Sequence, residues 1–263
     1  MVGVEGPRVA GSEGDTTQDF LMINGPAFSA GSTKGFLRNL KLLEKTTDRA
    51  PGAKEVLSTV MQGVNKALEA VGIESATVKT LGGHPETHPL GETYFTQVPL
   101  LYGPYMAKFS LAPVSSSLQL LKDAPIETED RPDALRDAVT AFFGGQYAGD
   151  AEWELRVQLC TDVEKMPIEQ PDKEWPQDES PYIAVARLRI PRQPAWDPER
   201  VRAIDEGMSF NPWHALAAHR PLGAVMRARR AVYPLSVQFR SSHGRCPVME
   251  PRAEEAAAAA PQP

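Results

Sequence analysis

The stretch Glu152-Trp-Glu-Leu-Arg-Val-Gln-Leu-Cys160 alternates apolar and polar side chains along its length. Successive side chains of a β-strand point to opposite faces, so this pattern predicts a strand with one buried face. Three more β-rich runs accompany it, at 93–100, 105–111 and 182–190, and Tyr102-Gly103-Pro104 predicts a hairpin turn between the first two. Four or five such strands predict an antiparallel sheet or part of a β-barrel, in an α+β fold with flanking α-helices.

Apolar residues at helical spacing predict the flanking helices. Two of them cover 33–45 and 53–71, and Gly72 ends the second. A third begins at Pro132 and ends at Gly144-Gly145. A fourth covers 198–204 with Asp197 as its N-cap, and a fifth begins at Pro221.

The chain divides into three parts by composition. Residues 1–17 show no apolar period and predict an irregular N-terminal segment, whereas 18–245 carry the predicted strands and helices and form one domain. Within that domain, 165–181 is rich in Pro, Asp and Glu and is expected to be an exposed connector. Residues 246–263 are rich in Glu and Ala and hold too little apolar surface to fold alone, so we expect a disordered tail.

Charge and cysteine content restrict the partners and the compartment. The 263 residues carry a formal net charge of −6, which argues against a nucleic-acid partner, and the basic cluster of Arg227, Arg229 and Arg230 is more simply a solvated helix face. No apolar run approaches the ~20 residues of a membrane span, and the N-terminus lacks the order of a signal peptide. Cys160 and Cys246 form no evident pair. These features predict a cytoplasmic protein.

Common catalytic motifs do not occur in the sequence. Without G-x-S-x-G, a P-loop or G-x-G-x-x-G, covalent hydrolysis and nucleotide binding have no support. Prolines after His84 and His88 exclude the helix that would align them as metal ligands, and His214 and His219 diverge on a regular helix. One kind of site is left, an apolar pocket with a few polar groups, which is how a porphyrin is held.

Several segments, read in order, resemble landmarks of the haem catalase superfamily, and in particular of its small bacterial catalase-like haem proteins. They are Asp19–Phe28, Trp153–Leu159, Lys173–Pro176, Ile183–Ile190 and Met208–Gly223. The resemblance covers roughly residues 18–242. The order and approximate spacing of the segments carry it.

The resemblance implies a haem b cofactor and suggests roles for several residues. Catalases place an Asn beside a distal His above the haem, and Asn24 lies where the family has its Asn-Thr-Pro, although an ordinary turn Asn before Gly explains it equally well. Phe28 and Phe36 match residues that pack the distal pocket, and a core role explains them as well. Arg220 is similar to the arginine that pairs with a haem propionate.

Two departures from the family weigh against its full chemistry. The distal His of catalases lies on a strand upstream of the Asn, and no His precedes His84 here. The Arg-x-Phe-x-Tyr-Pro motif that supplies the iron ligand is read at 207–212, with Asn211 at the Tyr position. Since Asn ligates Fe(III) poorly, His214 or His219 would have to substitute, or the haem is lost.

The resemblance begins near the fourth of the eight strands of a catalase barrel. The expected barrel is therefore partial and leaves a sheet edge open. One explanation is that the chain is an N-terminally truncated product. The other is that the remaining strands come from a partner chain, for example a second copy in a homo-oligomer.

The leading hypothesis is a catalase-like haem protein that oxidises with peroxide or an organic hydroperoxide, with Asn24 polarising the peroxide and Arg220 anchoring the haem. Catalase activity is expected to be low because the acid–base histidine is absent. One alternative is a non-catalytic binding or interaction protein that keeps the scaffold without haem. Another is a haem isomerase or oxygenase that acts on a lipid hydroperoxide.

Overall fold

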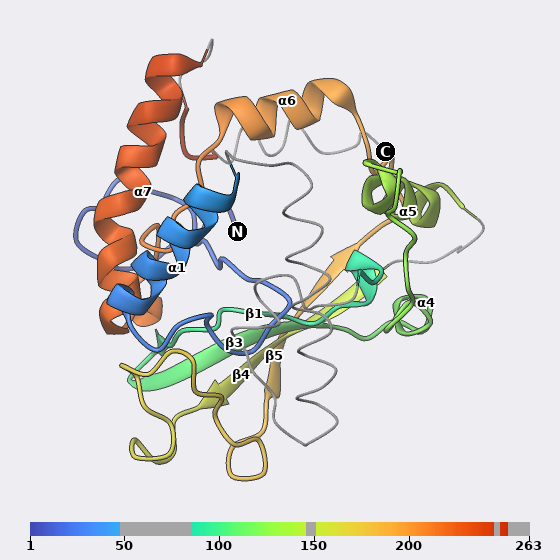
Figure 1. Ribbon diagram of the computed structural model, residues 1–263. Coiled ribbons are helices and arrows are strands. Elements are labelled where there is room, and N and C mark those ends of the chain that lie inside the picture. Colours follow the sequence, from blue (N-terminus) through green and yellow to red (C-terminus); the bar gives the residue numbers. More distant parts are fainter. Residues whose placement is uncertain (48–85, 146–150, 245–247, 252–263) are drawn as a thin grey trace.

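Figure 1 shows the computed structural model, in which residues 1–47, 86–145, 151–244 and 248–251 are described. The helices are α1 (Thr33–Thr47), α4 (Ser116–Gln119), α5 (Ala134–Gly144), α6 (Pro198–Gly207) and α7 (Gly223–His243), with the 3-10 helices η2 (Pro89–Gly91) and η3 (Ala217–His219). The strands are β1 (Tyr94–Phe95), β2 (Leu100–Tyr102), β3 (Tyr105–Pro113), β4 (Ala151–Leu159) and β5 (Ile183–Ile190). No described helix is long and apolar enough to cross a membrane.

The five strands form one antiparallel sheet in the order β1-β3-β4-β5, with β2 also paired to β3. Tyr102 pairs with Tyr105 across the predicted Gly103-Pro104 turn, so the hairpin is confirmed. In the centre of the sheet Phe109 lies opposite Val157, and Leu155 lies opposite both Leu111 and Ala186. The alternation at 152–160 is confirmed as β4, with Trp153 and Val157 buried.

The sheet does not close into a barrel, so the expectation of a barrel, even a partial one, is wrong for the described residues. Closure requires the two edge strands to pair with each other or through further strands, and β1 and β5 end the sheet instead. On β5 nearly every residue is exposed, including Ile183 (59 %), Val185 (41 %) and Leu188 (44 %). The open edge that the resemblance predicts is therefore present at β5.

Two apolar clusters fix the sheet to the helices. The larger one joins Phe109 of β3 and Val157 of β4 to Val225 and Met226 in the first turns of α7, with Phe28 beside them. The smaller one joins Trp153 of β4 to Leu118 of α4 and Phe142 of α5. Since burial of a large apolar side chain contributes roughly 1.5–3 kcal/mol, these clusters hold α7 at one end of the sheet and α5 at the other. Figure 1 shows α1 beside α7, and the two helices are in contact.

Most predicted helices are found where the spacing places them. The helix predicted at 33–45 is α1, the one after Pro132 is α5, and Asp197 caps α6 by accepting from the backbone N–H of Arg200 at 2.8 Å. α6 continues past the predicted end at Ile204 to Gly207. The helix predicted at 53–71 lies outside the described residues.

Pro221 does not open a helix, contrary to the prediction. It forms a β-bridge with Leu100, and the next residue, Leu222, donates its N–H to the carbonyl of Pro99. α7 begins only at Gly223, whose φ of +84° and close approach to the carbonyl of Ile168 suit a residue without Cβ. The strand-like pairing with β2 therefore decides where α7 starts.

Two segments expected to be exposed or disordered make specific contacts. The connector 165–181 buries Met166, Trp175 and Ser180, and Gln158 donates to the carbonyls of Trp175 and Ser180. Of the tail 246–263 only 248–251 are described; there Ser209 donates its N–H to Met249, which returns one to Gly207. Backbone groups of both segments therefore form hydrogen bonds with the rest of the fold, which the composition of the segments did not indicate.

Candidate active site

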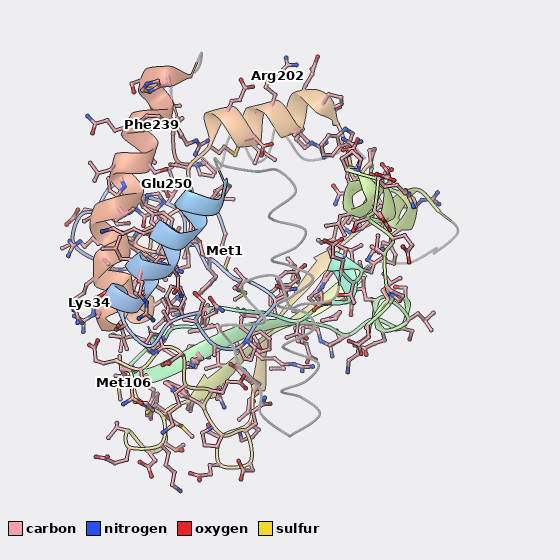
Figure 2. The ribbon with its side chains drawn as sticks, viewed as in Figure 1. Met1, Lys34, Met106, Arg202, Phe239 and Glu250 are labelled. Carbon is pink, nitrogen blue, oxygen red and sulfur yellow. The ribbon has the colours of Figure 1, made fainter. Side chains whose placement is uncertain are left out.

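A cavity of about 720 Å³ lies between the sheet and α7. Its volume is within the range of roughly 300–1,000 Å³ typical of ligand pockets. It is lined by Met1, Gln18–Ile23, Phe95–Gln97, Leu111, Leu155, Ala186–Leu188, Phe210, Arg229 and Tyr233. Met1 is labelled in Figure 2, between α7 and the sheet. Among the described residues, a hollow of about 880 Å³ is lined by residues of 32–41 alone, so it brings no two described elements together.

The sheet wall of the cavity is set by strand register. Leu111, Leu155 and Ala186 are neighbours in one row across β3, β4 and β5. The same face carries Phe109 and Val157, which pack on the start of α7. Further along α7, at Arg229 and Tyr233, the cavity separates the helix from the sheet. This wall is apolar and offers a flat surface to a ligand.

The α7 wall of the cavity presents Arg229 and Tyr233. Residues four apart lie on the same face of a helix, so both side chains line the cavity together. The guanidinium of Arg229 also lies 5.7 Å from the ring centroid of Phe28.

Arg229 and Tyr233 line the cavity but are not among the residues predicted from the sequence, which places the iron-ligand motif at 207–212. Residues 229–234, Arg-Arg-Ala-Val-Tyr-Pro, follow the pattern Arg-x-x-x-Tyr-Pro, with Ala231 where the family motif has Phe. The signal was a Tyr-Pro pair with an Arg four residues before the Tyr.

Asn24, Phe28 and Phe36 do not line the cavity. Asn24 is exposed, directly after Ile23, whose backbone pairs with Phe95. Phe28 is buried, and its ring lies 4.9 Å from that of Phe36. The two rings form part of the core on the far side of Arg229.

His219 and Arg220 lie behind the cavity wall. His219 is half-buried in an aromatic group: its ring stacks on Tyr102 at 6.3 Å and lies 5.6 Å from Phe20. Burial lowers the pKa of His219, and its Nδ1 is 3.3 Å from Oε1 of Gln18. Arg220 is exposed, and its carbonyl accepts the N–H of Leu101.

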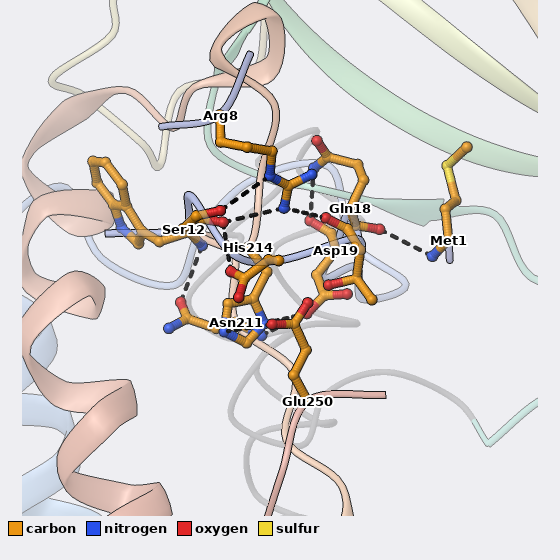
Figure 3. Close-up of polar contacts among 11 residues, drawn as sticks. Met1, Arg8, Ser12, Gln18, Asp19, Asn211, His214 and Glu250 are labelled. Atoms are coloured by element: carbon orange, nitrogen blue, oxygen red, sulfur yellow. Dashed lines mark hydrogen bonds and ion pairs between the residues drawn. The ribbon is translucent and has the colours of Figure 1, made fainter. Parts of the chain in front are cut away.

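Asn211 and His214 face away from the cavity, toward a buried carboxylate. The side chain of Asn211 accepts the N–H of Trp213 in a local turn, and its own N–H donates to Oδ2 of Asp19. The same oxygen lies 3.1 Å from Nδ1 of His214 (Figure 3). Of these residues, Asp19 alone lines the cavity. Within 208–214, Phe210 also lines it, whereas Asn211 and His214 hold Asp19 in place.

The comparisons concern the fold. No protein-family model and no curated sequence matches the chain. Among solved structures, a fungal catalase matches with a TM-score of 0.58 and 15 % identity over 85 % of this chain and 45 % of its own. A bacterial catalase matches with a TM-score of 0.56 and 14 % identity over 85 % of this chain and 43 % of its own. Catalase A from Saccharomyces cerevisiae matches with a TM-score of 0.58 and 13 % identity over 85 % of this chain and 46 % of its own.

This chain has a catalase-like fold. The three matches agree in covering most of this chain, and the resemblance read from the sequence is confirmed at the level of the fold. The chain spans less than half the length of each of these catalases. Activity and cofactor are therefore argued from the cavity itself.

Proposed function

We propose that this catalase-like chain binds haem b in the cavity between the sheet and α7, with Tyr233 as the iron ligand. The observation that carries the proposal is the pairing of Tyr233 with Arg229 on one wall of an apolar cavity whose other wall is the sheet. Neither residue was selected for this role from the sequence.

The residues of the cavity fit a haem. A phenol oxygen is one of the protein ligands that haem iron accepts, and the sheet row of Leu111, Leu155 and Ala186 opposes it as an apolar face. Haem, when bound, supplies iron-centred redox chemistry toward peroxides. Arg229, one helical turn from Tyr233, would place a positive charge on the same wall as the ligand oxygen.

Arg187 is a further candidate to hold a haem carboxylate. It is among the residues of β5 that line the cavity, and its side chain lies 3.5 Å from Glu154 and 3.8 Å from Glu152, on the face opposite Ala186. To hold a haem carboxylate, Arg187 would have to exchange these partners. Arg220, which the resemblance assigned to this role, is exposed and outside the cavity lining.

The reaction that fits the cavity is a slow peroxide-dependent oxidation, with hydrogen peroxide or an organic hydroperoxide as the oxidant. Among the described residues no histidine lines the cavity; its polar groups besides the arginines and Tyr233 include Gln18, Asp19 and Gln97. An amide cannot shuttle a proton, and Oδ2 of the Asp19 carboxylate is already engaged by the N–H of Asn211 and by the imidazole of His214. General acid–base catalysis contributes typically 10²–10⁴-fold to a rate. We therefore expect peroxidase-type turnover and little catalase turnover.

The visible spectrum of the full chain expressed with added haem tests this proposal. We expect a Soret band in the wild type, and Tyr233→Phe should weaken haem binding by at least about tenfold, because the phenyl ring leaves the iron without its protein oxygen. Tyr105→Phe is the matched control, since Tyr105 is exposed on β3 and outside the cavity.

Three outcomes would contradict the proposal. A wild type without a Soret band rejects haem, and a Tyr233→Phe protein with the wild-type spectrum rejects the ligand. A Soret band lost in His214→Ala but retained in Tyr233→Phe would assign the iron to the imidazole instead.

The open edge of β5 favours a second candidate, a non-catalytic interaction protein on the same scaffold. Among the described strands β5 pairs on one side only, with β4, and an edge strand with exposed apolar side chains is a template for another strand. If the chain lacks a Soret band and elutes as a stable oligomer or complex, this second function gains support and the first loses it.

A further inference from the structure

A second polar site lies beside the cavity and is built from three distant parts of the chain. Asp15 comes from the N-terminal segment. His214 comes from the turn before η3 and Glu250 from the segment after α7, and both are labelled in Figure 3. One ligand-type atom from each side chain lies within 4.8 Å of the others, and all three residues are half-buried. Haem binding uses none of them.

The imidazole of His214 is oriented by a buried carboxylate. Its Nδ1 lies 3.1 Å from Oδ2 of Asp19, whose side chain is only 6 % exposed. An imidazole N–H that donates to a carboxylate leaves its other nitrogen as a free acceptor, which is the usual outer contact of a metal-bound histidine. That other nitrogen, Nε2, lies 3.8 Å from Oε2 of Glu250.

The cluster holds more negative charge than its neighbours neutralise. Asp15, Asp19 and Glu250 surround one imidazole, and the nearby cation, Arg8, donates hydrogen bonds to Ser12 and to the carbonyl of Thr17. The buried Nη1 of Arg8 has no hydrogen-bond partner among the described residues. Ser12 in turn donates to Oδ2 of Asp15 at 2.5 Å. Three carboxylates therefore share one imidazole and one guanidinium among the described residues.

An orphaned oxygen points to a missing positive group. Oε1 of Glu250 is buried and has no hydrogen-bond partner among the described residues. Leaving a buried carboxylate oxygen unpaired costs roughly 1–3 kcal/mol or more, and a bound cation would remove that cost.

We propose that Asp15, His214 and Glu250 bind a divalent metal ion of the Zn²⁺ type, with Asp19 positioning the histidine. One imidazole and two carboxylates suit such an ion, which is bound at about 2.0–2.2 Å and therefore separates tetrahedral ligands by roughly 3.4 Å. The 3.8 Å between His214 and Glu250 is close to that separation. The ion would link the N-terminal segment, the 208–214 turn and the 248–251 segment to one another.

Zinc titration of the metal-stripped full chain, followed by calorimetry, tests the proposal. We expect saturable binding of one Zn²⁺, weakened at least about tenfold in Glu250→Gln and in Asp15→Asn, which keep the shape of each side chain. Asp137→Asn is the matched control, because Asp137 is an exposed carboxylate on α5 (56 %) remote from the cluster in sequence. Nitrogen NMR of the histidine rings adds a readout that a structural role would not move: Nε2 of His214 should shift with zinc, and the exposed His243 should not.

No saturable binding to the wild type would overturn the proposal, as would equal affinity in the wild type and Glu250→Gln. If Asp15→Asn fails to fold, Glu250→Gln and the ring-nitrogen shift decide alone. A zinc-induced shift at His243 or His88 in place of His214 would place the ion elsewhere and reject this site.

Discussion

Lys108 shows how a single residue sets the pH dependence of stability. It is 2 % exposed on β3, donates Nζ to the carbonyl of Lys173 at 3.0 Å, and lies 5.2 Å from the ring centroid of Trp175. Burial lowers the pKa of Lys108 from 10.5 to about 8. Burial of the ammonium therefore costs desolvation free energy. The connector 165–181 offsets part of that cost through the carbonyl of Lys173 and the ring of Trp175.

The free energy of unfolding should rise with pH through this lysine. Between pH 8 and 10.5 the unfolded chain binds more protons at this site than the folded chain, so stability increases by about 3 kcal/mol over that interval and this group adds no slope below it. Urea unfolding at several pH values measures the slope. Lys108→Met should remove that rise, whereas Lys165→Met, at an exposed ion pair, should keep it.

At the scale of elements, α7 combines a firmly packed start with a loosely packed end. Val225 and Met226 are buried, and Arg227 forms a two-pronged contact with Glu169. After Pro234 the helix exposes Leu235 and Phe239, both at 63 %. Pro234 has no N–H to donate and crowds the carbonyl one turn earlier, so the helix is weakest where its packing stops.

Replacing this proline should strengthen the second half of α7. Pro234→Ala restores one helical hydrogen bond and removes the crowding, worth up to about 3 kcal/mol locally. Amide hydrogen exchange should show slower exchange for 235–243, with little change in 224–230. The exposed substitution Leu235→Ala serves as control. Unchanged protection in Pro234→Ala would mean that tertiary contacts, and not the proline, limit this half of the helix.

At the scale of the whole molecule, the open sheet is the main feature. Among the described strands the sheet ends at β5, whose exposed apolar residues would suit pairing with another chain. A charged residue on such an edge blocks pairing without disturbing a packed core, since surface substitutions usually change stability by less than about 0.5 kcal/mol.

Val185→Lys should therefore reduce self-association while leaving the fold intact. Sedimentation velocity over a range of concentrations measures the change, and circular dichroism checks the fold. Val157→Lys places the same charge on β4, where the side chain is 2 % exposed, and should unfold the protein. Equal association by the wild type and Val185→Lys would show that β5 is not the contact.

Local patterns predicted the elements well. The alternation at 152–160 is β4, the helical spacing at 33–45 is α1, and Asp197 caps α6. Strand alternation, helical periodicity and capping depend on residues a few positions apart, so they can be predicted from the sequence. The end of α6 and the start of α7 were less predictable, because contacts with distant residues set them.

The candidate site was predicted only in part, and for a physical reason. The density of polar and aromatic residues at 208–220 drew attention, but Asn211, His214 and His219 mainly bond to segment 18–20 and hold it in place. His and Asn side chains serve both to stabilise a fold and to bind ligands, so a high density of such residues in the sequence does not tell the two roles apart. Arg229 and Tyr233 carried a recognisable spacing that went unread.

The sequence by itself determined the strands, most helices, the acidic character and the order of catalase-like segments, because each depends on near neighbours or on composition. Only the tertiary structure decided that the sheet stays open at β5, that Arg229 and Tyr233 face Leu155 across a cavity, and that Asp15 and Glu250 meet at His214. These last features join residues far apart in the chain. Their proximity follows from strand register and helix docking, which no local pattern encodes.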